Sequence, residues 1–124
     1  MELDMTISDG VYGVHFVNGA IDFGSGTITL RNGVINGGDH GFFYQGSLEP
    51  QTSSGDEISV AGKLHVRRWN ERIPSVVPGL TDYMLEVKGS INPVTHSIEL
   101  QGTSTSVPGT ALKIKATKLG DLVE

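Results

Sequence analysis

The chain has 124 residues, a length that fits one domain with a single core. Apolar residues make up 37% and charged residues 19%, and the apolar runs are short, which excludes a disordered chain and a membrane-spanning helix. The absence of cysteine excludes disulfides and thiolate metal sites, and the net charge of −5 disfavours a general nucleic-acid binder.

Charge is distributed unevenly along the chain. Residues 1–62 carry eight acidic residues and one arginine, whereas residues 63–124 carry eight basic and six acidic residues. Such a dipolar chain can form a homodimer or present an acidic face to a basic protein. The first residues are acidic and lack the basic and apolar regions of a signal peptide, so we expect a cytoplasmic protein.

Apolar residues recur with a period of two, which predicts eight short β-strands. The expected strands cover residues 12–16, 27–31, 34–35, 42–48, 58–67, 83–87, 98–100 and 112–116. Asn32-Gly33 between two such runs predicts a type I′ hairpin turn, and Gly37-Gly38 predicts a break between strands. Residues 69–81 hold two prolines and are expected to form a crossing loop, with room for one helical turn.

Seventeen glycines and regularly spaced turns favour an all-β fold, either a sandwich or an eight-stranded antiparallel up-and-down barrel. Glycines inside strands, such as Gly62 and Gly102, permit the bends that barrel closure requires and favour the barrel. A weak repeat, residues 46–50 and 89–93, is expected at strand ends. The side chains expected to point inward are those of Tyr12, Val14, Phe16, Ile28, Leu30, Val60, Leu64, Val66, Leu85, Val87, Ile114 and Ala116.

Side chains suited to catalysis or metal binding are present but scattered. The four histidines are far apart in sequence and form no ligand motif. Asp39-His40 follows two glycines, and Asp is a common turn residue because its carboxylate accepts hydrogen bonds from nearby backbone amides. We therefore expect no metal, no cofactor and no catalytic residue.

Two polar segments are candidates for recognition of another molecule. Arg67, Arg68 and Trp69 combine residue types that are enriched at interface hot spots. The same group could instead be a strand end whose indole covers one mouth of the barrel, or could stack on a base of single-stranded nucleic acid. The tract 51–57 is predicted to be a polar hairpin tip, where Asp56 and Glu57 either dock a basic partner or are simply solvated.

A series of short motifs resembles a known family. The motifs, in chain order, are Asp9-Gly10-Val11-Tyr12 with Phe16, Gly24-Ser25-Gly26-Thr27-Ile28, Leu30-Arg31-Asn32-Gly33, Gly37-Gly38-Asp39, Tyr44-Gln45-Gly46, His65-Val66-Arg67-Arg68-Trp69-Asn70 and Ile73-Pro74-Ser75-Val76. Over roughly residues 9–90 the chain resembles the GrlR-type negative regulators of bacterial type III secretion. The segment 64–77 is the most specific part of the resemblance.

The resemblance implies a small closed lipocalin-like barrel with an apolar interior that pairs as a homodimer. It implies a cytoplasmic protein that is not an enzyme and that sequesters a transcriptional activator protein, so that secretion genes stay off. In the family, an acidic run before the fifth strand is associated with partner recognition. The corresponding place here, Ser54-Gly55-Asp56-Glu57, has two acidic residues.

An alternative function is that of a carrier for a small apolar, lipid-like molecule, because an eight-stranded barrel can hold one small ligand. Gly62 is then expected to leave space inside. The residues predicted to line this cavity are Tyr12, Val14, Phe16, Val60, Leu64 and Leu85. For the favoured regulator we predict partner contacts through Asp56, Glu57, Arg67, Arg68 and Trp69, and we expect no direct contact with nucleic acid or membrane.

Overall fold

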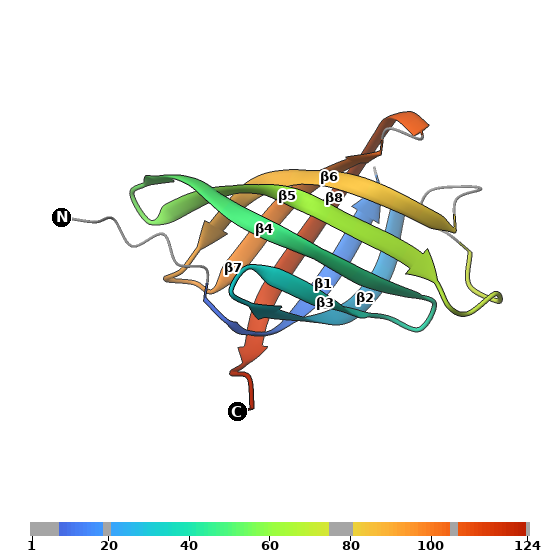
Figure 1. The fold of residues 1–124 in the computed structure, drawn as a ribbon, viewed down its shortest axis with the longest axis horizontal. Helices are drawn as coiled ribbons and strands as arrows, with labels where there is room; N and C mark the ends of the chain where they lie inside the picture. Colours follow the sequence, from blue (N-terminus) through green and yellow to red (C-terminus); the bar gives the residue numbers. More distant parts are fainter. Residues whose placement is uncertain (1–7, 19–20, 75–80, 105–106, 124) are drawn as a thin grey trace.

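A computed structural model describes residues 8–18, 21–74, 81–104 and 107–123. The described chain folds into eight antiparallel strands (Figure 1). These are β1 (Gly10–Asn18), β2 (Ile21–Arg31), β3 (Val34–Gly38), β4 (Phe42–Ser54), β5 (Glu57–Arg68), β6 (Asp82–Asn92), β7 (Ser97–Ser104) and β8 (Val107–Gly120). No helix within the described ranges is long and apolar enough to cross a membrane.

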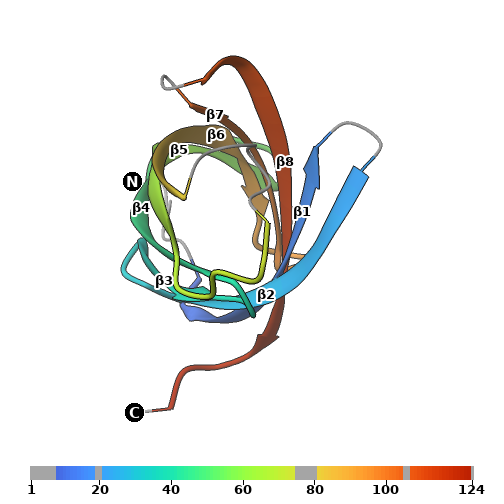
Figure 2. The ribbon, with the colours of Figure 1, turned by 90° about the vertical axis from the view of Figure 1, so that its right-hand side faces the viewer.

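The strands close into a barrel in sequence order, because each pairs with the next and β1 pairs with β8 (Figure 2). In the closing pair, Val14 lies opposite Ala116 and Phe16 lies opposite Ile114. Each of the eight strands therefore has a paired neighbour on both sides. The prediction of an eight-stranded antiparallel up-and-down barrel is confirmed.

The apolar face of each strand turns toward one core. All twelve residues predicted to point inward are buried, and Tyr12, Leu30 and Leu85 are at most 1% exposed. The alternate side chains face outward: Lys113 is exposed and His65 is half-buried on the outer wall. The period-two pattern therefore assigns the faces of these strands correctly.

The turn within the polar tract 51–57 is shorter than predicted. Residues 51–54 continue β4, and only Gly55 and Asp56 form the tip, with Gly55 at a φ of 61°. Strand pairing extends to the tip because Thr52 and Ser59 face each other, with their hydroxyl oxygens 2.5 Å apart. β-branched and hydroxyl side chains of this kind favour paired strands over an open loop.

Gly37-Gly38 was predicted as a break, and this prediction is wrong. Both glycines lie in β3, where a Cβ atom at Gly37 would overlap the carbonyl oxygen of Thr27 on β2. The absence of a side chain at Gly37 lets the backbones of β2 and β3 lie close together. The turn comes after Gly38, at Asp39. The Asn32-Gly33 turn is confirmed, with φ values of 51° and 80° at its two residues.

Two further expectations are only partly met. The first copy of the repeat, residues 46–50, lies inside β4 rather than at its end, while residues 89–92 do end β6. In the crossing loop, residues 69–74 form turns without a helix, and residues 75–80 lie outside the described residues.

Candidate functional site

One end of the barrel is organised by Asp39, which follows β3. Its Oδ1 accepts hydrogen bonds from the backbone amides of Gly41 and Phe42, each at 2.8 Å, and its Oδ2 accepts one from the Tyr44 hydroxyl. The Asp39 amide in turn donates to the Phe42 carbonyl at 2.8 Å. This is the turn role predicted for Asp39, and it commits both carboxylate oxygens to structure.

The Tyr44 side chain is buried beneath this turn. Burial, followed by the hydrogen bond to Asp39, raises the pKa of Tyr44 above its ordinary value. The phenol therefore stays protonated and donates to the carboxylate. Tyr44 packs against Phe16, with ring centroids 5.0 Å apart, so the pair belongs to the core as much as to the turn.

Trp69 follows β5 and lies against the Asp39 turn from outside. Its backbone amide donates to the Gly41 carbonyl at 2.9 Å, and its indole Nε1 donates to the Asp39 carbonyl at 3.1 Å. Asn70 strengthens the connection, because its side-chain amide donates to the His40 carbonyl at 3.0 Å. Trp69 is nevertheless 58% exposed, so its ring is held in place while much of it faces solvent.

The residue that packs at this mouth is Ile73 rather than Trp69. Ile73 is partly buried against the core, and a Cβ atom at Gly41 would lie only 2.5 Å from its Cγ2. The other interpretation of Trp69, as an indole that covers one mouth of the barrel, stays a prediction. Sequence reasoning missed the packing role of Ile73, although an isoleucine before a proline in a polar loop is a usable signal.

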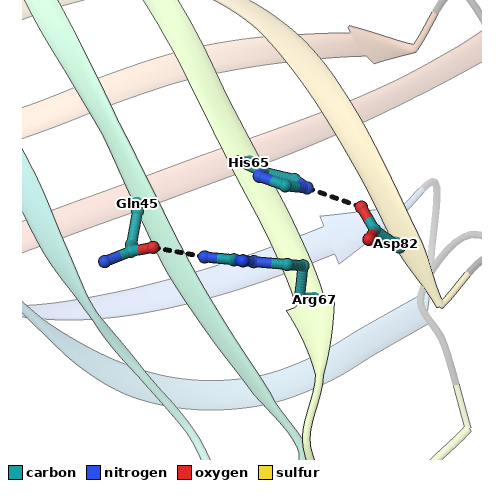
Figure 3. Close-up of polar contacts among 4 residues, drawn as sticks. All are labelled: Gln45, His65, Arg67 and Asp82. Atoms are coloured by element: carbon teal, nitrogen blue, oxygen red, sulfur yellow. Dashed lines mark hydrogen bonds and ion pairs between the residues drawn. The ribbon is translucent and has the colours of Figure 1, made fainter.

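Arg67 is fixed on the outer wall beside this end. Its guanidinium lies 4.5 Å from the centroid of the Phe43 ring and donates to the Gln45 side-chain oxygen (Figure 3). On the same strand, β5, His65 Nε2 lies 2.5 Å from Oδ1 of Asp82 on the neighbouring strand β6. Asp82 lies opposite Arg67 in the strand register but pairs with His65, so Arg67 makes no ion pair among the described residues. The buried Nε of Arg67 has no hydrogen-bond partner there.

The predicted partner-binding residues fall at opposite ends of the barrel. Asp56 and Glu57 are exposed at the tip before β5, whereas Arg67, Arg68 and Trp69 lie at and beyond its end. A strand of this length separates them by roughly 35 Å at about 3.3 Å per residue. The two groups therefore form two surfaces and not one patch.

The predicted cavity residues are all buried in the core. Two of them, Phe16 and Leu85, line a small, partly open pocket of about 10 Å³, together with Asp39 and Tyr44. A pocket of this volume accommodates about one water molecule. Gly62 leaves no space for a ligand, because a Cβ atom there would overlap the Ser47 carbonyl oxygen.

Within the described ranges, no three His, Asp or Glu side chains gather closely enough to hold a metal ion. The model of the family described as the type III secretion negative regulator GrlR matches residues 7–122. The chain belongs to the GrlR family. No curated protein matches it.

Membership in the GrlR family makes this protein a negative regulator of type III secretion and not an enzyme. The family match also extends the resemblance seen in the sequence, because it includes β7 and β8. A GrlR-type regulator implies a regulatory protein partner, so exposed and fixed side chains are the features of functional interest. Trp69 is exposed and held in place, and Arg67 is held in place and half-buried.

Proposed function

We propose that this GrlR-family protein represses type III secretion genes by binding and sequestering a transcriptional activator in the cytoplasm, and that it does so as a homodimer. Family membership supports a regulatory partner, and the observation that carries the proposal is Trp69. An indole that is 58% exposed yet held by hydrogen bonds from its amide and its ring is prepared for burial against a protein.

The neighbouring Arg67 supports the same surface. Its stacking on Phe43 and its contact with Gln45 restrict the guanidinium before any partner arrives. A restricted arginine loses less side-chain entropy on binding than a free one. Arg67 and Trp69 therefore offer an anchor surface at the Asp39 end, and Asp56 and Glu57 offer a separate acidic surface that attracts a basic partner.

The test uses the transcriptional activators encoded with the secretion genes of the same genome, each purified and titrated against this protein. We expect one of them to form a stable complex that no longer binds its promoter DNA. Trp69→Ala should weaken that complex, whereas Val94→Ala, which also shortens an exposed apolar side chain, should not. The proposal fails if no activator binds, or if both variants bind as the wild type does.

A further inference from the structure

Four of the five lysines of the chain gather on one outer face of the barrel. The face is formed by β5, β6, β7 and β8, which follow one another around the wall (Figure 2), and Ser47, Glu49 and Gln51 of β4 lie at its edge. It is hollowed in two adjoining places, of about 590 and 570 Å³, which share Lys88 and Gln101. We call this feature the lysine groove; its charged lining residues are Glu49, Lys63, Glu86, Lys88, Glu99, Lys113 and Lys115.

Strand register explains where positive charge accumulates in the lysine groove. Gln101 on β7 lies between Lys88 on β6 and Lys113 on β8, so two lysines flank a neutral residue. Their Cα atoms are roughly 10 Å apart, the width of two strand spacings. Lys115 lies two residues from Lys113 on the same strand face, about 7 Å along β8.

These lysines make no direct ion pair within the part of the chain that the structure describes. Lys63 lies opposite Glu86 and Lys115 opposite Glu99, yet none of the four makes an ion pair with a described residue. Lys88 and Lys113 have only Gln101 between them. An anion placed over Gln101 would lie between these two positive charges and attract both.

We propose that the lysine groove binds an acidic, extended segment of a protein partner. In an extended chain, alternate side chains are about 7 Å apart, which matches the spacing of Lys113 and Lys115. The inference goes beyond the proposed function, because none of the residues assigned to activator binding lies in this groove.

The three glutamates in the groove favour a peptide over a nucleic acid. A phosphate backbone carries a charge at every nucleotide and would face Glu86 and Glu99 as well as the lysines. A polypeptide can place its carboxylates opposite lysines and neutral or basic residues opposite glutamates. No aromatic ring lines the groove among the described residues, so bases would have no surface on which to stack.

The experiment titrates the wild-type protein with a fluorescein-labelled peptide of alternating Glu and Gly, and with its Gln-Gly counterpart, by fluorescence anisotropy. We expect the acidic peptide alone to bind, with an affinity that decreases as salt increases. Lys113→Glu with Lys115→Glu should weaken binding roughly tenfold, since each exposed pair contributes modestly. Arg31→Glu with Arg72→Glu changes the net charge equally outside the groove and should leave affinity within about twofold.

An NMR measurement locates the bound peptide, and a second double variant guards against misfolding. In the ¹⁵N-labelled protein, the acidic peptide should shift the backbone amide signals of Gly89 and Gln101. Lys113→Gln with Lys115→Gln replaces the double glutamate variant if that variant does not fold. The proposal is overturned if the acidic peptide does not bind at millimolar concentration, if both double variants weaken it equally, or if a single-stranded oligonucleotide binds the same groove more tightly.

Discussion

Asp39 connects the core of the barrel with the exposed end of β5. Its carboxylate accepts hydrogen bonds from two backbone amides and from Tyr44, and its carbonyl accepts the indole N–H of Trp69. The buried phenol and the exposed indole are thus fixed by the same turn. A short-range turn signal, Gly-Gly-Asp, therefore positions a residue 30 positions away in sequence.

Asp39→Ala is expected to destabilise the barrel by about 2–3 kcal/mol, because it leaves buried donors without acceptors. Asp56→Ala, at the exposed tip, is the matched control and should change stability by less than about 0.5 kcal/mol. Urea unfolding followed by far-ultraviolet circular dichroism measures both values. Equal midpoints for the two variants would show that the Asp39 contacts do not stabilise the fold.

The raised pKa of Tyr44 predicts that the free energy of unfolding decreases at alkaline pH. Its folded-state pKa is raised by burial and by Asp39, whereas the unfolded chain releases the phenolic proton near the ordinary pKa of about 10. Above that pH the unfolded state binds fewer protons than the folded state, so the free energy of unfolding decreases as pH rises.

Tyr44→Phe should make this decrease less steep, although Tyr12, whose pKa is also raised by burial, remains in both proteins. Urea unfolding between about pH 9 and 11 measures the two slopes. Parallel slopes for wild type and variant would contradict a raised pKa at Tyr44.

At the scale of the strands, alternation of apolar residues predicts the eight strands and their inner face, and the glycines inside strands favour the barrel over the sandwich. Tyr12, Val14 and Phe16 show why: they are alternate residues of β1, they are apolar, and all three are buried. Glycines were harder to interpret, because the same residue suits a turn or a close strand approach. Asn32-Gly33 was predicted correctly from its flanking alternation, whereas Gly37 needed its neighbour β2.

Two glycines inside strands differ in whether the neighbouring backbone leaves room for a side chain. At Gly62 an added Cβ would overlap the Ser47 carbonyl, while at Gly13 its nearest neighbour is the flexible Leu119 side chain at 3.5 Å. Gly62→Ala should therefore destabilise the protein by about 1–3 kcal/mol. Gly13→Ala should be neutral or stabilising by up to about 1 kcal/mol. Thermal unfolding of both variants tests this, and similar melting temperatures would contradict the close approach at β5.

On the scale of the whole barrel, closure decides which residues meet. Arg67, Arg68 and Trp69 were recognisable as a motif, but the contacts of Arg67 with Phe43 and Gln45 depend on the pairing of β4 with β5. The lysine groove depends on the register of four strands, which no local pattern contains. The separation of Asp56 from Trp69 follows from the length of β5, which was predicted to be shorter.

This separation predicts that the two ends affect activator binding through different rate constants. Trp69→Ala removes an anchor and should raise the dissociation rate constant about thirtyfold or more, the size of a hot-spot loss. Asp56→Lys with Glu57→Lys changes exposed charges that attract a basic partner, so it should slow association severalfold at low salt.

Salt and stability distinguish these effects when binding is followed by surface plasmon resonance. The slower association of the double lysine variant should disappear at high salt, because exposed charges are screened over about 10 Å or less. The effect of Trp69→Ala should persist there, since it arises from buried apolar area. Melting temperatures serve as the control: the indole is largely exposed, so both variants should unfold near the wild-type temperature. If Trp69→Ala instead unfolds the barrel and the double lysine variant associates normally, Trp69 is a structural residue and the activator binds elsewhere.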